Sequence, residues 1–253
     1  MPKIDNLEHI RYRFIFPSET EKQGESIERA FAIFLEKGTN DLVQPMREDE
    51  PIPDWAKLNY CKCSTCPLSD KDYQFCPAAR ALVDVVEFFC DLPSFGEVEV
   101  VVETPLRTYS AKTSVQQGVR SLMGLIMPVS GCPVLSRLKP MTFLHLPFSS
   151  NDETTYRAVS MYLIGQYFSQ RFGGEASFDL EGLRKIYKEI HRVNVDFINR
   201  LKGASSNDAN LNSLVSLDIF TMAVPRSIDT LLEVFLPLFL PPEDIDEDSS
   251  SCC

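Results

Sequence analysis

The stretch CKCSTCP at residues 61–67, followed by Cys76-Pro77, is the feature around which this chain is organised. It places four of the chain's eight cysteines within 16 residues, at the spacing C-x-C-x2-C-x9-C. Thiolates bind zinc and iron–sulfur clusters, and a C-x2-C pair lets two sulfur atoms turn back on one ion. We therefore predict a metal site on a loop over residues 61–76. The predicted ligands are Cys61, Cys63, Cys66 and Cys76.

The spacing leaves the metal open between two kinds of centre. Zinc in a tetrahedral four-thiolate site is the simplest interpretation, although the spacing differs from the matched knuckles of a zinc ribbon. A 4Fe-4S cluster is the alternative, because Cys-Pro occurs three times and also closes cluster motifs of bacterial ferredoxins. Cys61 is the weakest of the four predicted ligands, since C-x-C is the tightest spacing. With three ligands the centre would keep an open position, which favours a redox role.

Cys76 stands immediately before a predicted helix. Residues 77–92 carry apolar side chains at helical spacing, and Pro77 suits the first position of a helix. The thiolate of Cys76 would then face the positive end of the helix dipole. That position lowers the pKa of a thiol and favours metal binding.

The other chemistry-bearing residues favour ordinary structural roles. Cys132 lies in the turn SGCP, where a buried small residue is the simpler interpretation and an activated thiol or extra metal ligand the alternative. His145 is expected to be a satisfied core residue, and His191 to lie on a solvated helix face. The chain has neither a Walker A motif nor G-x-G-x-x-G, and no nucleophile motif accompanies its histidines. The sequence thus favours a non-enzymatic protein, with a thiol enzyme using Cys132 as a further alternative.

Composition and charge limit the class of protein. With 44% hydrophobic and 24% charged residues, the chain of 253 residues has the composition of a globular protein. Its net charge of −11 repels a phosphate backbone and argues against a nucleic-acid partner. We see no signal peptide and no apolar run long enough to span a membrane. We therefore expect a cytoplasmic protein, where thiols stay reduced and clustered cysteines indicate metal rather than disulfides.

Hydrophobic periodicity predicts an α+β fold, with an N-terminal antiparallel β-sheet and a mainly α-helical C-terminal half. Alternation predicts strands at residues 9–16 and 97–103, and another near residues 31–35, where a helix over 26–35 is the alternative. Residues 141–148 favour a buried strand or an extended segment. The predicted helices cover residues 77–92, 114–127, 151–172, 179–201, 211–224 and 228–239.

The organisation along the chain is predicted in three parts. Residues 1–150 form an α+β domain that carries the cysteine-rich loop at 61–76. Residues 151–240 form a helical region packed on that domain. Residues 241–253 are an acidic tail, expected to be disordered, that ends in the thiols of Cys252 and Cys253.

The ordered motifs PDWAKL, CSTCPL, FCPAARAL, SGCP, LKPM, LHLPF and ETTYRAVSMYL resemble a family of bacterial proteins of unknown function. The resemblance covers about residues 8–170, and it implies a bacterial origin and a meaningful cysteine cluster but no catalytic residues. The function predicted here is that of a non-enzymatic binding or regulatory protein with a structural metal site and an unidentified protein partner. The alternative is an iron–sulfur redox or sensor protein. Neither a nucleic acid nor a membrane is expected as a partner.

Overall fold

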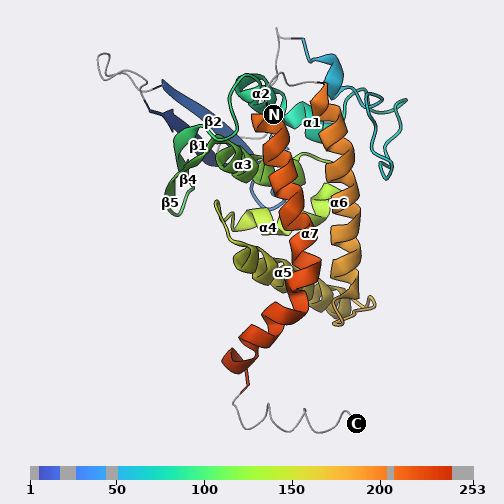
Figure 1. The fold of residues 1–253 in the computed structure, drawn as a ribbon. Coiled ribbons are helices and arrows are strands. Elements are labelled where there is room, and N and C mark those ends of the chain that lie inside the picture. The colour runs from blue at the N-terminus through green and yellow to red at the C-terminus, as the bar shows by residue number, and fades with distance from the viewer. Residues whose placement is uncertain (1–5, 18–26, 44–50, 204–207, 241–253) are drawn as a thin grey trace. The chain divides into compact units, whose positions relative to one another are not determined.

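The structure is a computed structural model that describes residues 6–17, 27–43, 51–203 and 208–240. An N-terminal antiparallel sheet is followed by a mostly helical second half, so the predicted α+β class is confirmed (Figure 1). In chain order the elements are β1 (Leu7–Phe16), β2 (Ile27–Glu36), β3 (Leu42–Val43), η2 (Asp54–Ala56), α1 (Pro77–Ala81), α2 (Val83–Phe89), β4 (Glu97–Glu103), β5 (Thr108–Ser114), α3 (Val115–Val129), η3 (Leu135–Leu138), α4 (Lys139–Phe143), α5 (Asn151–Arg171), α6 (Glu181–Lys202), α7 (Ala209–Phe235) and η4 (Leu236–Leu238).

The strands form one five-stranded antiparallel sheet in the order β3-β2-β1-β4-β5. Strand β1 lies at its centre and pairs Tyr12 with Phe31 of β2 and with Val102 of β4. These three side chains are buried, and the residues between them along each strand face the other side. On that other side Arg13 forms an ion pair with Glu28, 2.7 Å apart. The alternation along the strands thus gives the sheet one apolar face and one solvated face.

Helices α2 and α3 cover the apolar face of the sheet (Figure 1). Phe89 of α2 packs its ring 4.9 Å from that of Phe14, measured between centroids. Helix α3 approaches the sheet at Gly118, where an added Cβ would stand 2.7 Å from Phe14 Cε1 and 2.8 Å from Val100 Cγ2. Helix and sheet therefore meet at a position that has room only for glycine.

The chain divides into two compact units. The first combines residues 1–148 with 188–219, so it contains the sheet, α1 to α4, the later part of α6 and the start of α7. The second combines residues 149–187 with 220–253. In it, Arg184 of α6 forms an ion pair with Asp229 of α7, 2.7 Å apart. The predicted division at residue 150 into two domains stays a prediction, and the predicted tail at 241–253 lies outside the described residues.

Several element predictions are corrected by the structure. Residues 27–36 form a strand, so the alternative of a helix over 26–35 is wrong. The predicted helix over 77–92 is two short helices, because Leu82 leaves helical geometry and its N–H closes a tight turn on the carbonyl of Ala79. The start of the segment 141–148 is helical rather than extended, because it belongs to α4 (Lys139–Phe143). Pro140 lies in the first turn of this helix, where proline is tolerated.

The two helices predicted over 211–224 and 228–239 are a single helix, α7. Pro225 lies inside it, although proline removes a backbone hydrogen bond and normally breaks a helix. Val224 and Ile228 are both buried, so the helix continues through the proline between two anchored positions. Arg184 donates a hydrogen bond to the Pro225 carbonyl, which satisfies one acceptor near the irregularity.

The packing at Gly118 yields a prediction for the stability of the fold. Gly118→Ala should lower the free energy of unfolding by about 1–3 kcal/mol, because its methyl group overlaps Phe14 and Val100. Chemical denaturation followed by circular dichroism measures the change. Gly124→Ala is the matched control on the same helix, since its Cβ would meet only Leu217 at an ordinary 3.6 Å. That control should be neutral or stabilising by up to about 1 kcal/mol; an equal loss in both variants would contradict the close contact.

Candidate metal centre

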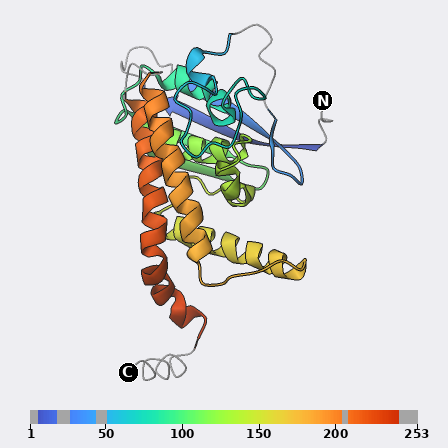
Figure 2. The same ribbon diagram turned by 90° about the vertical axis from the view of Figure 1, so that its right-hand side faces the viewer.

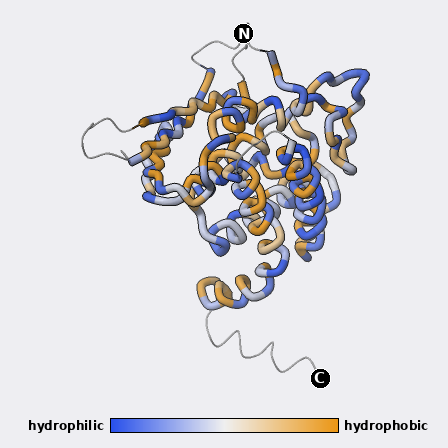
Figure 3. Tube along the Cα trace, turned by 45° about the horizontal axis from the view of Figure 1, so that its top comes forward, coloured by the Kyte–Doolittle hydropathy of each residue, from blue (hydrophilic) through white to orange (hydrophobic). Residues whose placement is uncertain are grey.

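Backbone hydrogen bonds close the cysteine loop at its base, where residues 55–58 and 74–76 come together. This base is called the neck of the loop. Lys57 and Phe75 form an antiparallel β-bridge, and the Cys76 N–H donates to the Ala56 carbonyl at 2.9 Å. Between these two points no helix or strand forms in the described chain, and Figure 3 shows the loop as largely hydrophilic. Its two ends are thus fixed by backbone hydrogen bonds, while its interior has few apolar side chains to hold it.

The C-x2-C pair lies on a tight turn that α6 holds in place. The Cys66 N–H donates to the Cys63 carbonyl at 3.0 Å, so both side chains leave one turn of backbone. Ser64, between them, donates its N–H and its hydroxyl to Asp196 Oδ2, each at 2.8 Å. The later part of α6 accordingly lies beside this loop in both ribbon views (Figure 1, Figure 2).

Cys76 and Cys132 are built into the chain in the same way. Each is followed by proline and starts a helical turn, in which its carbonyl accepts a backbone N–H four residues on at 2.9 Å. Cys76 is the residue before α1, as the sequence predicted. Cys132 follows α3 on a turn in which Gly131 takes a φ of 90°, a conformation that favours glycine.

A small cavity of about 20 Å³ is lined by four thiols. Three of the predicted ligands line it, and Cys132 is the fourth. Val193 and Phe197 of α6 are among the apolar residues that complete it. The cysteines at this cavity are Cys63, Cys66, Cys76 and Cys132. They come from the loop, the start of α1 and the turn after α3, so the fold brings together three segments that are separate in the sequence.

Cys61, the remaining predicted ligand, lies apart from this group. It is exposed, takes a φ of 45° and does not line the cavity. Cys132, which the sequence offered as an alternative extra ligand, lines the cavity in place of Cys61. The signal for it was present in the sequence, since SGCP repeats the Cys-Pro step of Cys76.

Burial dominates the electrostatics of the clustered thiols. It raises the pKa of Cys63 to about 12, with the nearby Cys76 and Asp196 adding to the effect and Arg200 opposing it. Burial also raises the pKa of Cys76 and of Cys132, against the backbone amides at the start of the helical turn that follows each. In the absence of a metal these three thiols are therefore protonated at neutral pH.

The sulfur atoms as placed do not form a metal site. Within the described ranges, no group of three or more His, Cys, Asp and Glu side chains stands in a metal-binding arrangement.

Arg200 joins the last turn of α6 to the neck of the loop. Its guanidinium donates to the carbonyls of Trp55 at 2.5 Å and Lys57 at 2.7 Å, and at longer range to those of Leu58 and Cys61. The side chain is fully buried. The sequence prediction did not include Arg200.

The two histidines discussed above have defined partners. His145 is within 2.5 Å of the Tyr12 hydroxyl through Nε2, so it is satisfied by a core residue as expected. His191 was predicted on a solvated face, but its Nδ1 lies 2.9 Å from Asp218 on α7. The side chain of His191 is 36% exposed, so it lies at the edge of the solvated face and also has a buried carboxylate as its partner.

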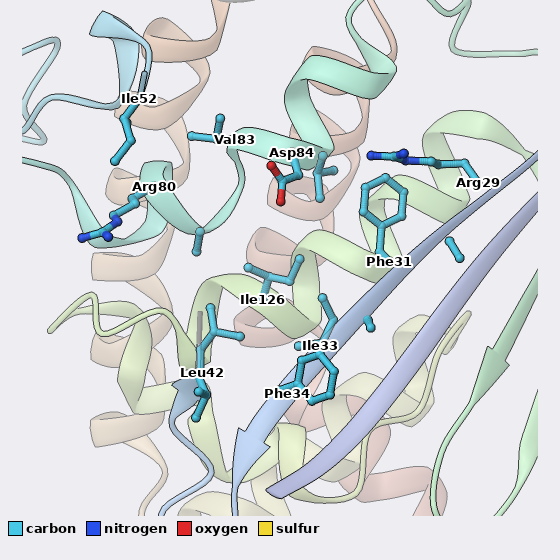
Figure 4. A pocket seen from close by; sticks show the side chains of 15 residues that line it. Arg29, Phe31, Ile33, Phe34, Leu42, Ile52, Arg80, Val83, Asp84 and Ile126 are labelled. Atoms are coloured by element: carbon cyan, nitrogen blue, oxygen red, sulfur yellow. The ribbon is translucent and has the colours of Figure 1, made fainter. Parts of the chain in front are cut away.

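A second, larger cavity of about 200 Å³ lies along the outer edge of β2 (Figure 4). Arg29 and Arg80 lie toward opposite ends in that view, with Asp84 between them. Its lining contains no Ser, Cys or His, so it offers no hydroxyl or thiol nucleophile and no histidine base. The clustered thiols are therefore the better candidate for chemistry.

A family model matches residues 10–240 of the chain, under the description of a domain of unknown function (DUF6901). The chain belongs to this family. An unknown-function family was the expectation from the motifs, and the match extends well beyond residue 170. No curated protein and no solved structure gives a significant match. None of the described helices is long and apolar enough to cross a membrane.

The geometry predicts different reactivities for Cys61 and the clustered thiols. In native protein with a chelator at neutral pH, iodoacetamide should alkylate Cys61 at least roughly tenfold faster than Cys76, because only Cys61 is exposed. Peptide mass spectrometry at successive times measures both rates. In denaturant the two rates should become similar. A Cys61 as slow as Cys76 in the native protein would contradict its place outside the cluster.

Proposed function

We propose that this protein is a metal-binding protein whose centre is formed by the thiolates of Cys63, Cys66, Cys76 and Cys132. The observation that carries the proposal is that these four thiols line one cavity although they come from three segments of the chain. Four cysteines are the ligand set of structural zinc sites. The role proposed is structural, within a non-enzymatic binding or regulatory protein.

A structural role is supported by how little apolar packing the interior of the loop has. Its interior has no helix or strand and is mostly polar, so burial of apolar surface contributes little to its order. A metal bound by the loop, the start of α1 and the turn after α3 would join all three. The free energy of metal binding then becomes folding free energy for this part of the chain.

Zinc is supported over an iron–sulfur cluster by the size of the cavity. About 20 Å³ is close to the space that one water-sized sphere occupies. A space of this size suits a single ion, whereas four irons and four sulfides would need the surrounding segments to move apart. An iron–sulfur cluster remains a distinct outcome of the measurement below, since it gives a brown protein.

Metal content is the direct test of the proposed centre. Protein purified anaerobically with a reductant should contain about one zinc per chain by mass spectrometry of the elements. Cys132→Ser should lower that content strongly because it removes a ligand, and Cys61→Ser should leave it unchanged.

Cys90→Ser is the matched control, because Cys90 is a cysteine that does not line the cavity. Wild-type protein free of both zinc and iron would refute the metal centre. A brown protein with several irons per chain would replace zinc by a cluster on the same ligands.

Loss of the metal should lower stability. Chelation of the wild type, or Cys66→Ser, should cost at least about 2 kcal/mol of unfolding free energy. For a chain of this size that lowers the Tm by about 4–8 °C. Differential scanning calorimetry measures the shift, and chelation should have no further effect on Cys66→Ser. An unchanged Tm after verified removal of the metal would rule out the structural role.

A further inference from the structure

Arg200 is a buried positive charge without a negative partner in the described chain. Its side chain is fully buried, and it forms no ion pair with a described carboxylate. Asp196, one turn earlier on α6, is engaged by Ser64 instead. Burying an unpaired guanidinium costs several kcal/mol, so native proteins pair such charges or compensate them in another way.

Carbonyl groups satisfy most of the hydrogen-bonding capacity of Arg200 but not its charge. Both terminal nitrogens donate to loop carbonyls, and the Nε–H has no hydrogen-bond partner. The rings of Tyr60 and Phe197 lie 5.9 and 6.0 Å from the guanidinium carbon, measured to their centroids. Carbonyl dipoles and aromatic rings lower the free-energy cost of burying the guanidinium, but they carry no net negative charge.

The group of thiols would supply negative charge near Arg200 once a metal ionises it. Arg200 is close enough to Cys63 and Cys76 to favour their ionised forms. Phe197, which contacts the guanidinium, also lines the cavity that the thiols share. Four thiolates around one divalent ion leave two excess negative charges at this place.

We propose that Arg200 is the buried counter-charge of the four-thiolate centre, so that metal binding and burial of this guanidinium stabilise each other. The proposal rests on the function proposed above and adds a partner for the centre. With protonated thiols and no metal, the cation lies buried without compensation. With the metal bound, the dianionic centre and the cation attract each other in a poorly solvated environment.

Coupling of this kind is reciprocal. If the metal favours the buried position of Arg200, then Arg200 favours retention of the metal by the same factor. Because the guanidinium ties the loop to α6 through four carbonyls, removal of the metal should loosen both the loop and the last turn of α6. The central strands, which lie elsewhere in the same unit, should be unaffected.

The affinity for zinc tests the coupling through substitutions. Competition with a chromophoric chelator should show zinc binding about 10–100-fold weaker in Arg200→Gln than in the wild type. Arg200→Lys should lose less, because it keeps the charge. Lys62→Gln is the control: it removes an exposed cation of the same loop, which solvent screens, and its affinity should stay within about twofold of the wild type. Wild-type affinity in Arg200→Gln would overturn the proposal.

The effect of the Arg200 charge can be measured separately on protein that carries iron in place of zinc. Reduction of ferric to ferrous iron in a four-thiolate site adds one negative charge to it, which a nearby cation favours. The reduction potential should therefore be lower in Arg200→Gln than in the wild type, with a smaller shift in Arg200→Lys. A purely structural contribution of Arg200 predicts equal potentials, and that result would overturn the proposal.

Hydrogen exchange on the wild type covers the case in which Arg200→Gln fails to fold. Removal of zinc should lower the protection of amides at residues 196–202, while amides of β1 and β4 keep theirs. Unchanged protection at 196–202 would overturn the role of Arg200. If the wild type binds neither zinc nor iron, the proposed function fails first; if it binds metal and only the Arg200 effects are missing, this inference alone fails.

Discussion

The hydrogen bonds of Arg200 to the neck of the cysteine loop are the constraint on which the arrangement of this unit depends. They join residues 139 to 145 positions apart in the sequence. A single planar group bonded to four carbonyls fixes both the position and the orientation of the chain that leads into the loop. The last turn of α6 therefore anchors the start of the loop.

Packing of α3 on the sheet positions Cys132, the thiol that lies outside the cysteine loop. Gly118 allows α3 to approach β1 and β4 closely, and this fixes the line along which the helix leaves the sheet. At the end of that helix the turn through Gly131 presents Cys132. Packing between α3 and the sheet thus decides where the fourth thiol lies, although none of the packed residues touches the cavity. A centre of this kind depends on core packing as much as on its ligands.

The sequence predicted the features that depend on local patterns. Alternation in β1 and β4 identified the strands, and the dense cysteine spacing identified the loop. It offered Cys132 only as an alternative extra ligand, because the approach of Cys132 to Cys76 depends on how α3 packs. Arg200 was accessible in principle: it falls three residues after Phe197 and next to Leu201, on the apolar side of α6. A charged residue in a buried stripe indicates a specific partner.

At Pro225 and His191, tertiary contacts override what the local sequence pattern suggests. Proline signals a helix end, yet buried neighbours on both sides carry α7 through it. The position of His191 beside Arg192 suggests a solvated face, yet α7 brings Asp218 against it.

The interpretation of the clustered thiols and Arg200 needs both the sequence pattern and the tertiary structure. The sequence places the cysteines at metal-ligand spacing, and the fold adds a buried guanidinium that forms no ion pair in the described chain. Apolar packing explains buried cysteines, but it does not explain a buried guanidinium beside them, since protonated thiols carry no charge. The dianionic metal centre proposed above would account for both observations at once.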